Sequence, residues 1–275
     1  MVLWLYGVNF LLGLLVLLPS YAALRTEMGS SLEYLKLLDG FDYTVYSDFQ
    51  HWNGSIIDPL LSVSFWLGGF YLLLSIFFSG GILLYVTPSA TRQPRFRVSQ
   101  FLSASVQTFG RFFRLFLGVI GGITLLAFLG LFIGALLLSG LSDTLSEQEM
   151  IYLLLGCLLV FSLSALLVVC VGDYAKVKLF RRDENRVMEV FGQAMRFIFT
   201  HFRLVFGFYL VLLSIGAAGF AIYLLIDSQV KTGGWASLVV WFLIQQCFIF
   251  SRVFLRVWTL ATAVQVVADH DRQVL

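Results

Sequence analysis

Charged residues are scarce in this sequence. Asp, Glu, Lys and Arg make up 12% of the 275 residues, hydrophobic residues make up 59%, and the mean hydropathy is +0.90. An ordinary soluble domain has about 25% charged residues. This chain therefore has too little polar surface to cover a water-soluble globule, and its composition favours an integral membrane protein.

Cysteine and histidine are also too few to indicate a metal site or a disulfide. The three cysteines lie inside apolar runs, without a CxxC motif or a neighbouring histidine, and we interpret them as buried thiols. The three histidines are scattered along the sequence, and no P-loop, HExxH, GxSxG or GxGxxG motif stands in a meaningful context. We therefore predict a protein that is not an enzyme, with no catalytic residues, no cofactor and no metal. The residues concerned are Cys157, Cys170 and Cys247, and His51, His201 and His270.

Six stretches contain no charged residue and are long enough to cross a bilayer. About 20 apolar residues in a helix cross the ~30 Å hydrocarbon layer, and backbone groups in lipid must be satisfied within the segment. We predict an all-α, polytopic membrane bundle of six transmembrane helices. The first stretch lacks a basic n-region and exceeds the ~7 to 15 apolar residues of a signal peptide, so we expect a retained helix. The stretches are 1–24, 59–91, 115–142, 150–172, 204–226 and 232–251.

The segments between these stretches differ in charge. Segments 87–114, 173–203 and 252–275 contain 15 of the 18 Lys and Arg residues. Segments 25–58, 141–150 and 227–234 contain the other three, together with ten of the 16 acidic residues. Because basic loops stay on the cytoplasmic side, we predict that both termini are cytoplasmic. The basic residues flank the membrane, so we expect no nucleic-acid partner.

Two segments repeat one pattern of aromatic residues and arginine, FGRFFRLFLG at 109–118 and FTHFRLVFG at 199–207. Each follows an inward-running predicted span and a basic turn, and each precedes an outward-running span. We predict a parallel tandem repeat with units of about 59–142 and 150–227, in a single membrane domain of 1–275 with an outer loop at 25–58. With one gap, the alignment pairs Phe101 with Phe191, Ala104 with Ala194, Phe109 with Phe199, Phe112 with Phe202, Arg114 with Arg203, Leu115 with Leu204 and Gly118 with Gly207.

An amphipathic pattern precedes each copy. Apolar residues recur at helical spacing with arginines on the flanks, as in helices that lie in the headgroup layer against anionic lipid. We predict two interfacial amphipathic helices, each of which bends into a span at its copy. The apolar stripes are Val98, Phe101, Leu102, Ser105, Phe109 and Phe112, and Val187, Val190, Phe191, Ala194, Ile198 and Phe202. The residues expected to face lipid headgroups are Arg97, Arg111, Arg114, Arg186, Arg196, His201 and Arg203.

Polar residues inside the predicted spans are few. Gln245 and Gln246 lie near the middle of the sixth span, and we interpret them as interhelical hydrogen-bonding groups. Asp173 ends the fourth span, and Arg252 and Arg256 share a face at the end of the sixth. We expect Asp173 to pair with one of these arginines, because a half-buried guanidinium favours a carboxylate. The alternative is that each arginine extends to lipid phosphate.

Glycines are placed where helices could approach closely. GxxxG spacing permits close contact between helix backbones in membranes, and paired glycines can serve likewise. We therefore expect packing contacts, within the bundle or against a partner, at Gly118, Gly122, Gly130 and Gly134 and at the pairs Gly68–Gly69 and Gly80–Gly81.

Four segments resemble a group of uncharacterised bacterial six-helix inner-membrane proteins. They are DGFDYTVYSDF, FFSGGILLY, FGRFFRLF and GDYAKVKLFRRDENRVMEVFGQAMRFIFTHF. More distantly, the chain is similar to the membrane domain of glycerophosphodiester phosphodiesterases, over about 31–256. The resemblance implies a helical bundle in the bacterial cytoplasmic (inner) membrane. It implies no catalytic residue, because phosphodiesterase chemistry belongs to a soluble barrel domain that this chain does not contain.

Two classes of function remain open. The first is a non-catalytic membrane subunit or scaffold that docks other membrane proteins or copies of itself through apolar and glycine-rich faces. The alternative is a transporter or lipid-handling protein that binds an amphiphile between the repeats, near Gln245 and the interfacial helices.

Overall fold

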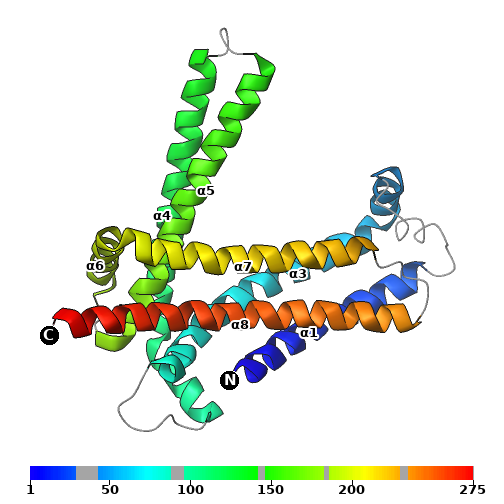
Figure 1. The fold of residues 1–275 in the computed structure, drawn as a ribbon. Helices are drawn as coiled ribbons and strands as arrows, with labels where there is room; N and C mark the ends of the chain where they lie inside the picture. The colour runs from blue at the N-terminus through cyan, green and yellow to red at the C-terminus, as the bar shows by residue number, and fades with distance from the viewer. Residues whose placement is uncertain (29–42, 88–95, 142–145, 183–185, 230–234, 275) are drawn as a thin grey trace. The chain divides into compact units, whose positions relative to one another are not determined.

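The computed structural model describes residues 1–28, 43–87, 96–141, 146–182, 186–229 and 235–274, and within them the chain is almost entirely helical. The prediction of an all-α protein is confirmed for this part of the chain. Part of the predicted outer loop, 29–42, lies outside the described residues. The helices are α1 (Val2–Met28), α3 (Tyr43–Val86), α4 (Val98–Leu141), α5 (Glu147–Arg182), α6 (Val187–Thr200), α7 (Phe202–Gln229) and α8 (Trp235–Val274), shown in Figure 1.

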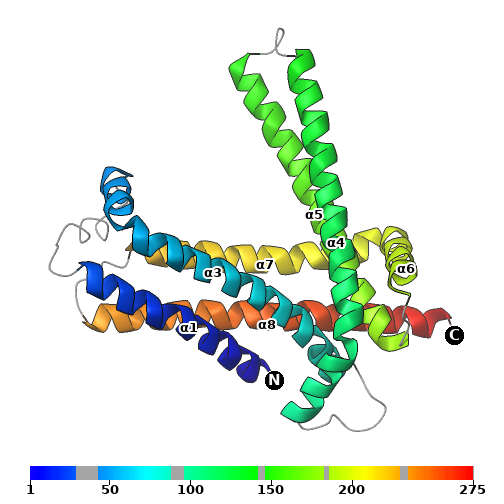
Figure 2. The same ribbon diagram turned by 180° about the vertical axis from the view of Figure 1, so that it is seen from behind.

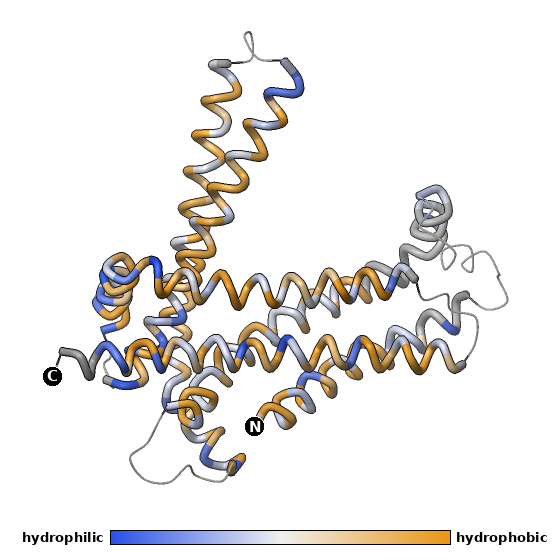
Figure 3. Tube along the Cα trace, in the orientation of Figure 1, coloured by the Kyte–Doolittle hydropathy of each residue, from blue (hydrophilic) through white to orange (hydrophobic). Residues whose placement is uncertain are grey.

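Six of these helices are long and apolar enough to cross a membrane, as predicted. Apolar colour runs along most of their length (Figure 3), because each helix contains a long stretch without charged residues. The candidate spans are Val2–Ala22, Leu60–Val86, Val98–Gly140, Glu147–Arg181, Phe202–Ser228 and Trp235–His270.

The chain divides into two compact units. Unit 1 consists of Met1–Ser75 and Ile215–Arg256, and unit 2 consists of Ile76–Ser214 and Val257–Leu275. The division falls within α3, α7 and α8, so it does not coincide with the predicted repeat units of 59–142 and 150–227. Those repeat units stay a prediction.

The largest fully buried side chains belong to unit 2. Helix α5 packs along both α4 and α6, and α4 also contacts α6. Helices α4 and α5 lie side by side in both views (Figures 1 and 2). The buried side chains, each less than 2% exposed, are Phe101, Phe112, Ile82, Leu83, Leu115, Leu179, Ile198, Val171, Val177, Val190, Val205 and Val264.

A glycine pair brings α3 against α4 in unit 2. A Cβ atom at Gly80 would overlap Thr108 Oγ1, and one at Gly81 would lie 2.5 Å from the Phe101 ring. The Gly81 N–H donates to Ser105 Oγ at 3.1 Å. The expected glycine packing is found here, because only a residue without a side chain leaves room for the facing helix.

The other glycines predicted to pack against helices make looser contacts or none among the described residues. Gly122 and Gly130 face α5, where added Cβ atoms would lie 3.6 Å from Val168 Cγ1 and 3.9 Å from Phe161 Cδ2. Gly118 faces Met188 of α6 at 3.5 Å. No described atom lies within 4 Å of the Cβ positions of the remaining three, Gly134, Gly68 and Gly69.

Helix α5 begins with a capping box. Ser146 Oγ faces the Glu149 N–H at 3.4 Å, and Glu149 Oε2 accepts from the Ser146 N–H at 2.8 Å and its hydroxyl at 2.9 Å. The pattern Ser-x-x-Glu satisfies N–H groups that have no partner within the helix. This fixes where the second helix of the α4–α5 hairpin starts.

The two copies of the repeated segment differ in their backbone. The first lies within the uninterrupted helix α4, whereas the second is divided at His201, between α6 and α7. The His201 N–H donates to the Phe197 carbonyl at 3.1 Å, and its own carbonyl accepts from the Val205 N–H at 3.0 Å. The first copy therefore has no break in its helix, and the predicted bend of an interfacial helix into a span stays a prediction there. The helix is unbroken because the buried face of α4 continues without a break from Phe101 to Leu115.

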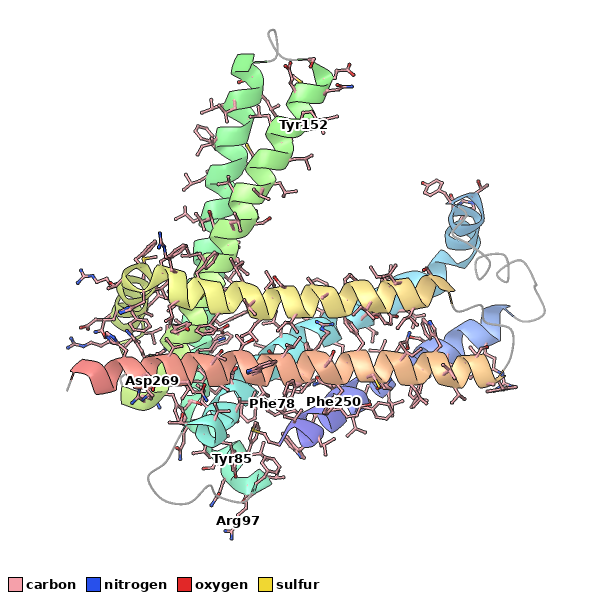
Figure 4. The ribbon with its side chains drawn as sticks, viewed as in Figure 1. Phe78, Tyr85, Arg97, Tyr152, Phe250 and Asp269 are labelled. Carbon is pink, nitrogen blue, oxygen red and sulfur yellow. The ribbon has the colours of Figure 1, made fainter. Side chains whose placement is uncertain are left out.

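In unit 1, side chains of α8 contact α1 and α7. The Tyr6 hydroxyl donates to Gln246 Oε1 at 2.8 Å, and its ring meets Phe250, labelled in Figure 4, edge-on at 5.8 Å. Trp241 Nε1 donates to Asp227 Oδ1 at 2.8 Å. These bonds satisfy polar groups of apolar helices, where an interhelical bond contributes about 0.6 kcal/mol on average.

Candidate functional site

An open groove of about 910 Å³ lies between α4 and the start of α6, within unit 2. Two of the seven residues predicted to face lipid headgroups, Arg114 and Arg186, are among its lining residues. We call it the arginine groove. Its lining residues are Arg114, Leu117, Gly118, Gly121, Arg186, Val187, Met188 and Glu189.

The arginine groove has a charged end. Arg114 is exposed, and the structure shows no hydrogen bond or ion pair for its side chain among the described residues. Arg186 Nη1 lies 3.4 Å from Glu189 Oε2, with the two side chains 84% and 54% exposed. Such an exposed pair contributes about 0 to 1 kcal/mol and is easily exchanged. The side chains of the groove therefore carry two positive charges and one negative charge.

The start of α6 adds backbone donors to this end. The first intrahelical bond of α6 runs from the Val190 N–H to the Arg186 carbonyl at 3.1 Å. The N–H groups of Val187, Met188 and Glu189 precede it, and Arg186 provides no side-chain cap. The N–H groups at a helix start and the helix dipole favour an anion at this position.

The rest of the groove is apolar, and two of its lining residues are glycines without side chains. Leu117 is 53% exposed, and the Met188 side chain reaches Gly118 of α4. No described atom lies within 4 Å of a Cβ placed on Gly121. Two glycines and a flexible methionine thus leave an adaptable apolar floor beside the arginines.

The other predicted headgroup residues lie outside this groove. Arg97, Arg196 and Arg203 are exposed, and Arg111 is half-buried. The backbone of Arg97 exchanges hydrogen bonds with the Tyr85 hydroxyl, at 2.9 Å from its N–H and 3.1 Å to its carbonyl (Figure 4). Whether these arginines face lipid stays a prediction.

His201 lies in a cluster of rings in unit 2. Its ring centroid is 4.8 Å from that of His270 and 5.1 Å from that of Phe197, and Lys178 Nζ lies 4.7 Å above the Phe197 ring. The interpretation of the histidines as scattered is wrong for this pair, because helix packing joins residues far apart in sequence. His201 is half-buried, so only part of its ring is available to a headgroup.

Asp173 has partners within unit 2. Lys176 Nζ lies 2.8 Å from Asp173 Oδ1, one turn along α5, and the Tyr209 hydroxyl donates to Oδ2 at 3.4 Å. Arg252 and Arg256 belong to unit 1, where the Arg256 guanidinium donates to the Ser75 carbonyl. The expected pairing of Asp173 with one of these arginines stays a prediction.

Among the described residues, neither a metal-holding cluster nor a predicted intramembrane glutamine lies at the arginine groove. No described group of three His, Cys, Asp or Glu side chains could hold a metal ion. Gln246 bonds to Tyr6, and its half-buried neighbour Gln245 lies on α8 in unit 1, so neither glutamine lines the groove. Sequence reasoning found both arginines but missed Glu189, Met188 and Gly121, which acquire meaning only when α6 approaches α4.

Comparisons with protein-family models, curated proteins and solved structures give no match to this chain. The resemblance to bacterial inner-membrane proteins therefore stays a prediction, and the functional argument depends on the geometry of the chain itself.

Proposed function

We propose that this chain is a non-catalytic multi-pass membrane protein that binds a lipid or similar amphiphile in the arginine groove. The supporting observation is that two arginines and an open apolar floor adjoin each other within one groove. An amphiphile has the same two chemistries, a polar headgroup joined to a hydrocarbon chain. Its headgroup would meet the arginines and the start of α6, and its chain would follow Leu117 and Gly121.

The dimensions of the groove support this proposal. Arg114 precedes Gly121 by seven residues of one helix, or ~10 Å at about 1.5 Å per residue. That length accommodates a headgroup and the first carbons of an acyl chain. The volume of about 910 Å³ also falls in the range of ordinary ligand sites, about 300 to 1,000 Å³.

The proposed membrane placement puts the charged end of the groove at the cytoplasmic surface. Arg114 and Arg186 belong to two of the three basic segments, and basic segments stay on that side. We propose a bacterial cytoplasmic (inner) membrane location, cytoplasmic termini and anionic lipids around Arg97, Arg196 and Arg203. The parallel repeat and the interfacial position of α6 belong to the same proposal.

Lipid retention after purification tests the proposed site. We expect Gly121→Leu to occupy part of the open groove and to reduce the amount of bound lipid, because nothing lies within 4 Å of its Cβ position. Native mass spectrometry of the full chain, released from mild detergent, measures the bound lipid. Gly110→Leu is the matched control, because Gly110 lies on α4 with open space at its Cβ and does not line the groove. Equal lipid retention by the two variants contradicts the proposal.

A scaffold function is the second candidate, and one observation in unit 1 favours it. Gly68 and Gly69 have open Cβ positions, and Phe65 and Trp66 beside them are 78% and 75% exposed. A bare glycine surface next to exposed aromatic rings is suited to close approach by another helix. A photocrosslinker at Gly68 should then capture one membrane protein, or a second copy of this chain, in cell membranes. Crosslinks to lipid alone contradict this function.

A further inference from the structure

We propose, on the basis of the proposed lipid-binding function, that the arginine groove selects phospholipids whose headgroup has one net negative charge, and that Glu189 sets this selectivity. The side chains of Arg114, Arg186 and Glu189 give the groove a net charge of about +1. A phosphodiester with an uncharged headgroup substituent, as in phosphatidylglycerol, neutralises this charge. The occupant is a membrane lipid and not free phosphate, because the arginines adjoin the apolar floor of Leu117 and Gly121.

The charged residues have different roles toward the phosphate. Arg114 is exposed and has no described partner, so its guanidinium can donate to phosphate oxygens without first breaking a contact. Arg186 contacts Glu189 at 3.4 Å, a long and exposed ion pair that a phosphate oxygen can displace. Both arginines then hold one phosphate, together with the N–H groups at the start of α6.

Glu189 opposes a second negative charge. A phosphomonoester, as in phosphatidic acid, has about −1.5 to −2 charges at pH 7 and would place the excess near the Glu189 carboxylate. A zwitterionic lipid leaves the groove with its positive charge uncompensated. Selectivity for a single charge therefore needs both the two arginines and the nearby carboxylate, as in sites that combine attraction with repulsion.

Lipid titration of the full chain tests this inference. The probes are phosphatidylglycerol, phosphatidic acid and phosphatidylcholine with identical acyl chains, added to detergent-purified protein and followed by native mass spectrometry. We expect phosphatidylglycerol to bind more tightly than either of the other lipids. Arg114→Gln and Arg186→Gln should each weaken its binding by about tenfold, the size of a lost hydrogen bond to a charged group. Arg25→Gln is the matched control, since Arg25 is exposed on α1 and does not line the groove.

Glu189→Gln gives the decisive result. Removing the carboxylate should raise the affinity for phosphatidic acid above that for phosphatidylglycerol, a gain that a misfolded protein cannot produce. Glu189→Gln could instead weaken the binding of an ammonium-bearing lipid and leave the affinity for phosphatidic acid unchanged. That result would show that the Glu189 carboxylate attracts a cation, and it would contradict the inference. Glycerol phosphate without acyl chains should not compete at the same concentrations, and competition would show a site for soluble phosphate.

The inference and the proposed function fail in different ways. If Gly121→Leu reduces binding of all three lipids equally and headgroup charge has no effect, a lipid site exists without the proposed selectivity. If Gly121→Leu changes nothing, the lipid site itself is wrong.

Discussion

The two copies of the repeated segment have similar sequences but are packed differently. Phe112 is 0% exposed and Leu115 is 1% exposed in the first copy, whereas their aligned counterparts Phe202 and Leu204 are 40% and 52% exposed. The first copy is part of one long helix, and the second is broken at His201. Similar residues therefore do not occupy similar environments in this protein.

Matching the buried residues of α4 and α6 pairs the two segments differently from the sequence alignment. The buried residues Phe101, Ser105 and Thr108 of α4 each have a buried counterpart 89 positions later on α6, and no gap is needed. These counterparts are Val190, Ala194 and Phe197. At the same offset, Phe112 corresponds to His201, the residue at which the second copy is interrupted. The comparison shows that helical phase, rather than residue identity, relates the two segments.

The largest expected effect comes from the contact of Gly81 with Phe101, which lies on α4 shortly before the first copy. Gly81→Leu should force α3 away from α4, because a Cβ alone would lie 2.5 Å from the Phe101 ring. We expect a loss of about 3 kcal/mol or more of unfolding free energy, at the upper end for overpacking. Thermal unfolding in detergent, followed by circular dichroism, measures it. Gly192→Leu on α6, shortly before the second copy, is the control, since its Cβ position is open. Equal stability of the two variants would remove this difference between the two segments.

An intermediate effect is expected from the aligned phenylalanines. Phe112→Ala should cost about 3 kcal/mol, because it leaves a cavity in the core of unit 2. Phe202→Ala should cost less than about 1 kcal/mol, since much of that ring is exposed. The same unfolding measurement distinguishes them. Similar losses for the two variants would support the gapped alignment over the correspondence by burial.

The smallest effect is expected at the helix break. His201→Ala removes ring contacts with Phe197 and His270 and should cost about 0.5 to 1.5 kcal/mol. Phe199→Ala is the control, because Phe199 is 58% exposed on the same turn. Hydrogen exchange at the start of α7 should increase for His201→Ala alone. If exchange is unchanged, the rings do not stabilise the break.

Much of the helical framework could be predicted from the sequence, because lipid imposes a simple rule. Each charge-free stretch was expected to form a helix long enough to satisfy its own backbone, and each contains or overlaps a candidate span among the described residues. The apolar stripes were also predicted in part, since Phe101, Ser105 and Phe112 and Val190, Ala194 and Ile198 are buried. Helical periodicity is enough to identify such residues.

The features that could not be predicted from the sequence depend on contacts between distant parts of the chain. Phenylalanine is so common here that the alignment matched Phe101 to Phe191, one position away from the correspondence by burial. His201 and His270 are brought together by α6 and α8, which no local pattern indicates. In the arginine groove, the arginines were recognisable by charge, but Met188 and Gly121 acquire a role only where two helices meet.

The hydrogen bond from Tyr6 to Gln246 has a consequence for biosynthesis. Its donor leaves the ribosome well before its acceptor, which follows 240 positions later. At about 5 to 20 residues per second, the tyrosine hydroxyl waits roughly 12 to 48 seconds for its partner. During that interval α1 resides in the membrane without this bond, which forms only after α8 has been synthesised.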